Sequence, residues 1–433
     1  MATAEKFGKK VTEKAIKLMK NRYICDHCLG RSFAELLSGL SNKERGKIVR
    51  HYIAFLVDSG EKIDIDPSNF HAIKLRNVKI KTKGPTKGPT KCKVCKNFFL
   101  ERIDELTRHI TKKMSDYEFD TFLIGTTVSG ELVRAEEKVW EQAGIEFVEP
   151  IKNEINRELG KLVEKRTKRK FNPDRPDIVA MIDLATERVK LEIRSLYIYG
   201  KYKKLVRGIT QTKWVCKECH GKGCIACKGE GKLYKNSVQE IMEKPLIKAA
   251  KAKKSKFHGA GREDVDARCL GKRPFVIELL KPRKRNIDLK KIQTQINKSK
   301  KVKVSGLRIA TKADIKEVKF SRYDKTYLAE VTFAKEIDKK KLKLLKRLSG
   351  QTIKQKTPTR VAHRRADIVR KRKLEKITAK LIGEKNLQLK IRGESGLYIK
   401  ELIMGDDGRT QPNIAELLNN KVKNIKLDVI KIG

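Results

Sequence analysis

The chain has 433 residues, with 103 Lys and Arg against 53 Asp and Glu, which gives a formal net charge of +50 at pH 7. The length allows two or three domains, and basic residues spread along the whole chain favour a surface that binds a polyanion, above all nucleic acid, although part of the lysine excess could reflect adaptation to heat or salt. Because no apolar run reaches the length of a membrane-spanning helix and no signal peptide opens the chain, we expect a cytoplasmic protein with no membrane partner.

The first half of the chain has the pattern of an α+β domain. Apolar residues at helical spacing predict helices over residues 1–20, 103–114, 131–141 and around 155–162. Alternating apolar residues predict strands at 121–124, 178–182, 189–193 and 196–199. The repeated Lys-Gly-Pro-Thr at 83–90 predicts a loop, because Gly and Pro disfavour both helix and sheet.

The second half predicts another α+β domain, which begins near Ser237. Strands are expected at 275–280, at 327–333 and within 377–391, helices at 287–296 and 339–348, and a short helix or strand end around Tyr398. We therefore expect two domains, residues 1–235 and 236–433.

Eight of the nine cysteines form four C-x-x-C pairs. The pairs are Cys25/Cys28, Cys92/Cys95, Cys216/Cys219 and Cys224/Cys227. In a reducing compartment such pairs favour zinc ligation over disulfides. Redox chemistry of the thioredoxin kind is the alternative, but the first two pairs do not lie between a recognisable strand and helix. The remaining Cys269 is expected to be a buried small apolar residue.

The pairs at Cys216/Cys219 and Cys224/Cys227 are separated by four residues, so four thiolates can surround one zinc ion. Both belong to a tandem C-x-x-C-x-G-x-G unit that resembles the zinc repeats of DnaJ-type cochaperones, in which glycines allow positive φ and point backbone N–H groups at sulfur. We interpret this unit as a structural staple. His220 is a fifth candidate ligand, although with four thiolates present a surface or RNA-facing position is favoured.

The pairs at Cys25/Cys28 and Cys92/Cys95 are separated by 63 residues. Each pair by itself lacks two ligands, so joining them at a second zinc ion is the economical solution. The sequence leaves open whether they share that ion.

The loop His258–Gly271 places Asp264 two residues after Arg262. Nearby cations favour the ionised carboxylate, which could act as a nucleophile or base; capping a helix or pairing with the neighbouring arginines is the alternative. Two other segments accompany it, a Lys325-Thr-Tyr327 strand and Leu397-Tyr-Ile-Lys400-Glu401. Taken singly, Tyr327 would be a core strand residue and Lys400 a solvated charge.

Together these three segments resemble the active site of pseudouridine synthases. The second half resembles the archaeal and eukaryotic tRNA pseudouridine synthase family called Pus-ten, over residues 259–273, 325–331, 355–365 and 398–413. The first half resembles that family's zinc-bearing accessory domain through Cys25/Cys28 and Cys92/Cys95, and residues 60–200 are similar to a THUMP-type RNA-binding module. Cys269 departs from several relatives, without consequence for catalysis.

The resemblance implies a fold and an activity. The fold is α+β, with a pseudouridine synthase catalytic domain (a mixed antiparallel sheet with flanking helices) and an N-terminal zinc-bearing THUMP-like domain. The activity is an isomerase that converts uridine to pseudouridine in the TΨC arm of tRNA, at position 54, position 55 or both. The reaction needs no organic cofactor, and the protein is expected to hold two structural Zn²⁺ ions. No obligate protein partner or oligomer is expected.

The resemblance also implies roles for individual residues. Asp264 attacks the uridine, at C6 or at the anomeric carbon, while Lys400 pairs with Asp264 and keeps it ionised. Tyr327 stacks on the flipped base and assists proton movement at C5, and Ile399 packs beneath the base. Arg262 holds the loop or contacts phosphate. The segment Arg360–Lys373, led by Arg360, is a candidate RNA face or a merely solvated charged segment.

Two other classes of protein fit part of the pattern. RNA methylation or thiolation also uses THUMP-type modules, but the chain has no glycine-rich cofactor loop after a strand and no adenylating S-G-G-x-D-S loop. A non-catalytic, zinc-stapled RNA-binding or ribosome-associated protein fits the charge and the cysteines equally well. The set of Asp264, Tyr327 and Lys400 favours the enzyme over this binder.

Overall fold

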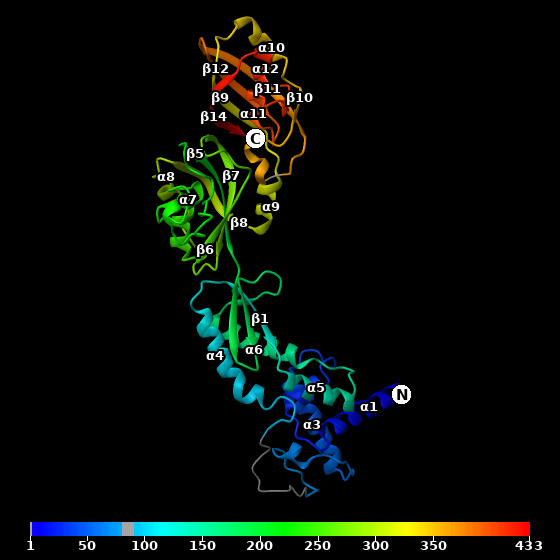
Figure 1. Cartoon of the computed structure of the whole chain (residues 1–433). Coiled ribbons are helices and arrows are strands. Elements are labelled where there is room, and N and C mark those ends of the chain that lie inside the picture. Colours follow the sequence, from blue (N-terminus) through cyan, green and yellow to red (C-terminus); the bar gives the residue numbers. More distant parts are fainter. Residues whose placement is uncertain (1, 80–90, 365) are drawn as a thin grey trace. The chain divides into compact units, whose positions relative to one another are not determined.

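The computed structural model describes residues 2–79, 91–364 and 366–433 and divides the chain into two compact units, residues 1–194 and 195–433 (Figure 1). The expected loop at 83–90 lies outside the described residues. Both units mix helices with sheet, which confirms the α+β class. Across the described ranges, no helix combines the length and the apolar character that a membrane crossing requires.

The N-terminal unit contains a four-stranded sheet of order β2-β1-β3-β4. The strands are β1 (Thr121–Thr127), β2 (Lys170–Phe171), β3 (Ile178–Asp183) and β4 (Arg188–Ile193). β1 is parallel to β2 and β3, and β4 closes the sheet antiparallel to β3. Helix α6 (Ile151–Thr167) packs on β1, and α4 (Ile103–Met114) contacts β4 and α6. Alternate residues of β1 and β3 are buried, as the alternating apolar pattern predicts. The predicted strands and helices of this unit are confirmed.

The N-terminal unit contains further helices besides α4 and α6. They are α1 (Ala2–Met19), α2 (Asp26–Arg31), α3 (Asn42–Asp58) and α5 (Gly130–Ala143), with a short 3-10 helix at Pro67–Phe70 and a short π-helix at Phe98–Arg102. Cys25 is the N-cap of α2, and Cys28 lies inside that helix. Helix α3, which the sequence reading did not include, begins at a capping box formed by Ser41 and Glu44.

The C-terminal unit contains a ten-stranded sheet in which nine strands have the order β13-β10-β11-β12-β9-β14-β7-β5-β8, with β6 paired to β7. The strands are β5 (Leu196–Lys204), β6 (Lys254–Gly259), β7 (Arg268–Leu280), β8 (Val302–Ala310), β9 (Lys325–Phe333), β10 (Thr352–Gln355), β11 (Arg370–Gly383), β12 (Asn386–Gly393), β13 (Thr410–Gln411) and β14 (Val422–Ile432). The helices are α7 (Val238–Ala250), α8 (Leu289–Asn297), α9 (Lys312–Phe320), α10 (Leu342–Lys346), α11 (Ile399–Met404) and α12 (Ile414–Leu418), and short 3-10 helices lie at Ile225–Cys227, Lys339–Lys341 and Thr359–Arg364.

This sheet has two hydrophobic cores, one on each side of its centre. One core is formed by β9, β11, β12 and β14 with α10, α11 and α12, and the other by β5, β7 and β8 with α7 and α8. The two halves join where β14 pairs with the start of β7, through Asp428 and Val429 opposite Arg268 and Cys269. The loop at 260–267 leads into β7 at this junction, so it lies where both halves of the sheet can contribute side chains.

The boundary between the units differs from the expected division at residues 235 and 236. Strand β5 pairs with β7 on one side and β8 on the other, and its Ile198 and Tyr202 are fully buried in the core of the C-terminal unit. The cysteines from Cys216 to Cys227 follow β5 and therefore belong to the C-terminal unit as well.

Candidate active site

The loop at 260–267 carries Asp264, and two buried cations hold its backbone. The Nζ of Lys204, on β5, donates to the carbonyl oxygen of Asp264 at 2.9 Å and to that of Ile209 at 3.0 Å. The Nη1 of Arg273, on β7, donates to the carbonyl oxygen of Ala260 at 2.7 Å. Gly261 has φ +75°, which favours glycine at the start of the turn.

Beneath the loop, Glu263 and Arg273 form a buried ion pair of 3.0 Å, with side chains 0% and 1% exposed. The Tyr202 hydroxyl donates to Glu263 at 3.0 Å, and the Gln211 amide donates to the Tyr202 oxygen at 2.8 Å. Burial by itself would lower the pKa of Arg273, but Tyr202 and Glu263 raise it by more, so the net pKa lies above the ordinary value. The sequence reading missed this cluster, although Glu263 stands next to Asp264.

The Asp264 carboxylate is 31% exposed and receives two cations from other parts of the unit. Arg360 Nη1 lies 3.1 Å from Oδ1, and Lys400 Nζ lies 3.6 Å from Oδ2. The expected contact between Lys400 and Asp264 is therefore present. The loop at 260–267 is described throughout and contains no helix, so helix capping does not account for Asp264.

Lys400 contacts a second carboxylate more closely. Its Nζ donates to Asp266 at 2.7 Å and 3.0 Å, against 3.6 Å to Asp264. Burial raises the pKa of Asp266, but the hydrogen bond and charge of Lys400 lower it more, so the net pKa lies below the ordinary value. Lys400 thus bridges two carboxylates of one loop.

Arg360 is held in the same way by a buried carboxylate. Its Nε donates to Glu401 Oε1 at 2.7 Å, and Glu401 is 2% exposed. Burial lowers the pKa of Arg360, but Glu401 and Asp264 raise it above the ordinary value. Helix α11, which carries Lys400 and Glu401, begins where the Gln355 amide accepts from the Tyr398 N–H at 2.8 Å and donates to the Tyr398 carbonyl at 2.9 Å.

Asp264, Arg360 and Lys400 line one cavity of about 340 Å³, within the ~300–1,000 Å³ range usual for ligand sites. Its wall contains every residue that the sequence analysis assigned to the substrate: Arg262, Asp264, Tyr327, Arg360, Ile399 and Lys400. Seven basic side chains line the cavity against two carboxylates, Asp264 and Glu263. The cavity therefore suits an anionic substrate.

Two cavity residues of β9 have shifted pKa values. Burial raises the pKa of Tyr327 to about 12, and the nearby Asp264 adds to this effect while Arg273 opposes it. The phenol is therefore neutral at physiological pH. Burial lowers the pKa of Lys325 to about 8, helped by Arg273, and its Nζ lies 3.3 Å from Ser395 Oγ.

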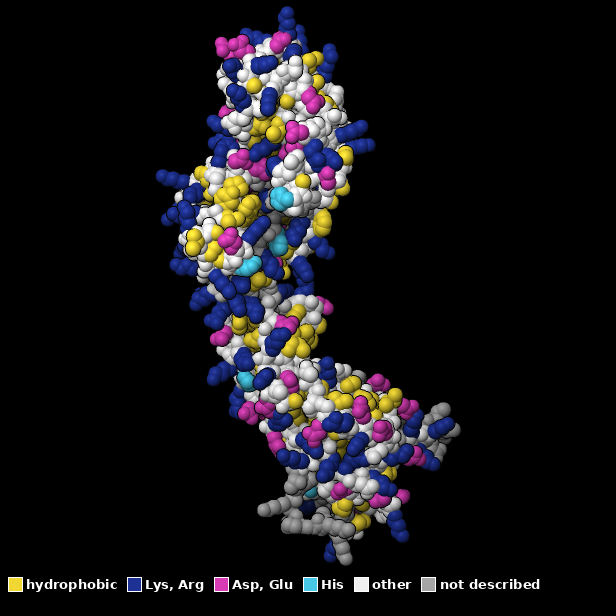
Figure 2. All heavy atoms as spheres, in the orientation of Figure 1, with side chains coloured by type: hydrophobic (Ala, Val, Ile, Leu, Met, Phe, Trp, Pro, Cys, Tyr) yellow, Lys and Arg dark blue, Asp and Glu magenta, His cyan; other side chains and the backbone are white. Residues whose placement is uncertain are grey.

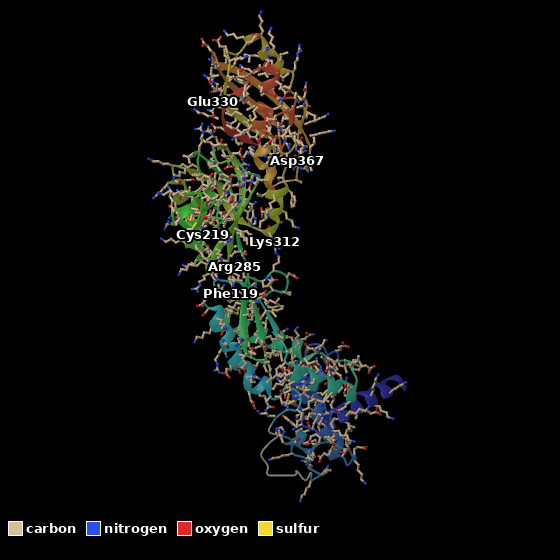
Figure 3. All side chains as sticks on the ribbon, in the orientation of Figure 1. Phe119, Cys219, Arg285, Lys312, Glu330 and Asp367 are labelled. Carbon is tan, nitrogen blue, oxygen red and sulfur yellow. The ribbon has the colours of Figure 1, made fainter. Side chains whose placement is uncertain are left out.

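The candidate RNA face Arg360–Lys373 starts in the cavity and continues to the surface. Arg370 and Arg372 line the cavity wall, whereas Lys371 and Lys373 are exposed; the side chains of residues 364 and 365 are outside the described part. Asp367, labelled in Figure 3, pairs with Arg409 and with Lys356. On the face seen in Figure 2, Lys and Arg side chains are spread over both units.

The eight paired cysteines form two clusters in which all four sulfurs lie within 4.8 Å of one another, and each could hold a metal ion. In the first, Cys25 and Cys95 are 3.6 Å apart, and all four members, Cys25, Cys28, Cys92 and Cys95, are buried. These separations exceed the ~2.05 Å of a disulfide and match the ~3.8 Å edge of a tetrahedron with Zn–S bonds of ~2.3 Å.

The second cluster contains Cys216, Cys219, Cys224 and Cys227, with sulfur separations of 3.7–3.8 Å. The N–H groups of Gly223 and Gly231 donate to the sulfurs of Cys219 and Cys227, and both glycines have positive φ, as predicted. His220 is exposed and is not part of the cluster. Cys269 is fully buried, as expected, and burial raises its pKa to about 11.

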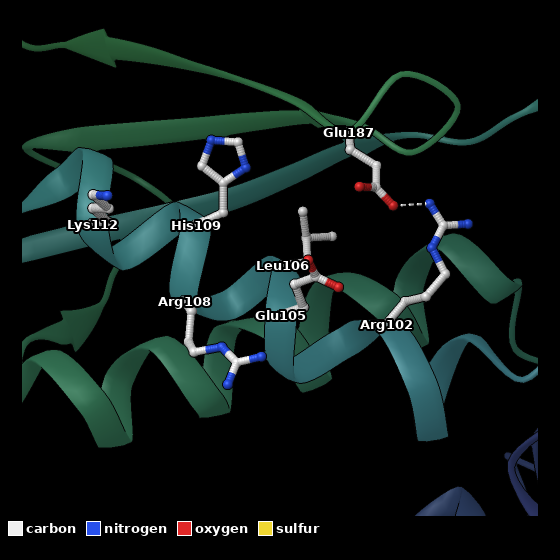
Figure 4. Close-up of a pocket in the computed structure, with 7 residues that line it drawn as sticks. All are labelled: Arg102, Glu105, Leu106, Arg108, His109, Lys112 and Glu187. Atoms are coloured by element: carbon white, nitrogen blue, oxygen red, sulfur yellow. Dashed lines mark hydrogen bonds and ion pairs between the residues drawn. The ribbon is translucent and has the colours of Figure 1, made fainter.

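The N-terminal unit has a cavity of about 380 Å³ along α4 (Figure 4). It is lined by Arg102, Glu105, Leu106, Arg108, His109, Lys112 and Glu187. An ion pair between Arg102 and Glu187 joins the start of α4 to the turn between β3 and β4. Three other cationic or imidazole side chains of α4 line the same wall, so the helix presents a mainly basic face.

Two family models match the chain. "Pus10, C-terminal" matches residues 197–433, and "Pus10 THUMP domain, archaeal" matches residues 106–183. Three curated relatives, each called "tRNA pseudouridine synthase Pus10", come from Methanothrix thermoacetophila (39% identical, 97% of this chain, 94% of that one), Archaeoglobus fulgidus (44%, 79%, 95%) and Methanopyrus kandleri (40%, 94%, 95%). Among solved structures, a "Cbf5-Nop10-Gar1 Complex" aligns at 15% identity and TM-score 0.28, covering 52% of this chain and 47% of that chain, which is too distant to argue from.

Proposed function

Because the chain belongs to the Pus10 family of tRNA pseudouridine synthases, it is an enzyme that converts uridine to pseudouridine in tRNA, and we propose that Asp264 is its nucleophile. The observation that carries this assignment is the convergence of Asp264, Tyr327, Arg360 and Lys400 on one basic cavity. No two of these residues are neighbours in sequence. A carboxylate side chain that opens into such a cavity can act as a nucleophile.

The reaction begins when the target uridine leaves its stack, which costs a few kcal/mol. Asp264 attacks the nucleotide, at C6 or at C1′, and the bond between N1 and C1′ breaks. The detached uracil turns, a bond forms between C5 and C1′, and Asp264 is released, while the proton lost from C5 is balanced by one gained at N1. Substrate and product have the same atoms, so the isomerisation needs no organic cofactor.

Tyr327 and Ile399 would hold the uracil. Tyr327 is half-buried and its phenol is neutral below about pH 12, so its ring can stack on the base and its hydroxyl can relay the C5 proton. Ile399 is 4% exposed and forms an apolar part of the cavity wall. Arg370 and Arg372 are at the same wall and would contact phosphate.

The RNA target is the TΨC arm of tRNA, at position 54, position 55 or both. Its recognition would use the basic segment Arg360–Lys373 together with the basic face of α4 in the THUMP-matched part of the N-terminal unit. Backbone contacts of this kind weaken steeply as salt rises.

Each four-cysteine cluster would hold one structural Zn²⁺. Four thiolates close the coordination sphere, so such an ion leaves no position for substrate and serves folding instead. The sulfur separations of 3.6–3.8 Å support this assignment.

The test is pseudouridine formation on an unmodified tRNA transcript with wild type, Asp264→Asn and the matched control Asp407→Asn, since Asp407 is exposed and lies outside the cavity. We expect wild type and the control to modify the arm, and Asp264→Asn to bind the transcript without forming product. Product from Asp264→Asn at the wild-type rate would overturn the nucleophile assignment. No product from any protein, with binding retained, would favour the non-catalytic RNA binder.

A further inference from the structure

A second cavity of about 230 Å³ adjoins the first in the C-terminal unit. The two cavities share Arg262, Glu263, Asp264, Arg360, Val361 and Lys400 in their walls. The second one extends from these residues to Trp214, Gln211 and Thr210. An RNA strand whose target base reaches Asp264 therefore meets a second compartment directly beside that base.

We propose that this second cavity is a subsite for a nucleotide next to the target uridine, whose base stacks on the pair formed by Arg262 and Trp214. This subsite rests on the proposed function of Asp264. Arg262 Cζ lies 5.5 Å from the centre of the Trp214 ring, a cation–π contact. Arg262 is exposed and Trp214 half-buried, so the pair presents planar surface to the cavity.

The chemistry of the wall suits a base joined to a phosphate. Unstacked RNA bases are recognised by stacking on aromatic rings and on guanidinium planes. Arg360 and Lys400 stand at the wall that both cavities share, where the phosphate between the two nucleotides would pass. The compartment thus offers a planar platform and the cations of Arg360 and Lys400, beside the carboxylates of Glu263, Asp264 and Asp266.

The second cysteine cluster positions Trp214. Trp214 stands two residues before Cys216, and its carbonyl accepts from the Leu233 N–H at 3.0 Å. Val215 and Lys232 form an antiparallel bridge beside it, and the Tyr234 ring packs edge-on against the indole at 5.5 Å. The segments on the two sides of the cluster therefore clamp the indole, so the cluster presents a platform to RNA in addition to closing a loop.

The experiment measures binding of a TΨC-arm hairpin in which the nucleotide on the 5′ or the 3′ side of the target uridine is abasic. Stacking of one base is worth about 1–3 kcal/mol, so one of the two abasic sites should weaken binding by roughly 5- to 150-fold. Trp214→Ala should cause a similar loss with the intact hairpin, and the abasic site should then add little. Trp214→Phe should restore most of the affinity. Independent, multiplying effects, or no effect above twofold from either change, would overturn the subsite.

Arg262→Lys separates stacking from charge, because Lys keeps the charge and loses the planar guanidinium. Affinity equal to wild type in Arg262→Lys would show that charge alone matters and would contradict the stacking platform. If Trp214→Ala loses metal or melts early, Arg262→Lys and the abasic hairpins carry the test. If wild type forms pseudouridine but the abasic site and Trp214→Ala weaken binding independently, the subsite alone is overturned. If the two changes are coupled in binding but wild type forms no product, the role of Asp264 is overturned and the subsite stands.

Discussion

Breaking the buried ion pair between Glu263 and Arg273 should destabilise the C-terminal unit and disturb the Asp264 loop together. At 3.0 Å and an effective dielectric constant of about 20, the attraction between the two charges is about 5 kcal/mol. In Glu263→Gln the Arg273 guanidinium loses its counter-charge, although it keeps its hydrogen bond to Ala260. We therefore expect a loss near the lower end of the usual 3–5 kcal/mol, about 3 kcal/mol. For a unit of this size that lowers the melting temperature by roughly 6–12 °C.

The assay is a double-mutant cycle in urea with Glu263→Gln, Arg273→Met and the double variant, and Glu330→Gln as a control. Glu330 lies exposed on β9 (Figure 3) and should change stability by less than about 0.5 kcal/mol. The double variant should be less destabilised than the sum of the two single variants, with a coupling of about 2–3 kcal/mol, because it leaves no charge buried alone. Turnover should fall in Glu263→Gln, since the backbone that presents Asp264 loses its support. Additive effects within about 0.5 kcal/mol would refute this reasoning.

Three further predictions concern other parts of the structure. Burial lowers the pKa of Lys325 from 10.5 to about 8, so the folded state binds fewer protons than the unfolded state between these pH values and wild-type stability rises with pH there. Lys325→Met has no charge to bury, so it should melt above wild type at pH 8, and this difference in melting temperature should shrink toward pH 10. A constant difference would argue against this reasoning. Cys219 and Cys224 are partly exposed whereas all four cysteines of the first cluster are buried, so a chelator followed by mass spectrometry should remove one of two metal ions first, and Cys219→Ser should lose that early phase; simultaneous loss would speak against two distinct sites. Replacing Arg370 and Arg372 with Gln should reduce the slope of log Kd for tRNA against log salt by about 1–2, and an unchanged slope would remove both from the RNA face.

The convergence of Asp264, Tyr327 and Lys400 could be expected because their three short segments together resemble the active site of pseudouridine synthases. Their partners could not. Lys400 lies closer to Asp266 than to Asp264, and Arg360 is held by Glu401. Both contacts depend on how the loop and α11 approach each other, and sequence spacing does not contain that distance.

The missed elements have physical reasons of their own. Strand β14 pairs with β9 through two register shifts, at Val422/Asn424 and Val429/Lys431, and such bulges break the alternation that predicts a strand. Helix α7 contains Pro245, which reads as a helix breaker. The expected division at residues 235 and 236 leaves β5 with the first half, because its partners in the sheet lie 65 or more residues away in the chain.

A cavity this basic poses a problem for a carboxylate nucleophile. The surrounding cations can bind the same carboxylate oxygens that must attack the substrate. The second carboxylates at this site address that problem. The shortest contacts of Lys400 go to Asp266, and the Nε of Arg360 goes to Glu401, so each cation is shared with a carboxylate other than Asp264. Asp264 remains 31% exposed beside both cations, open enough to reach a base. The ordering of the two cations by Asp266 and Glu401 would therefore keep Asp264 available for the proposed attack.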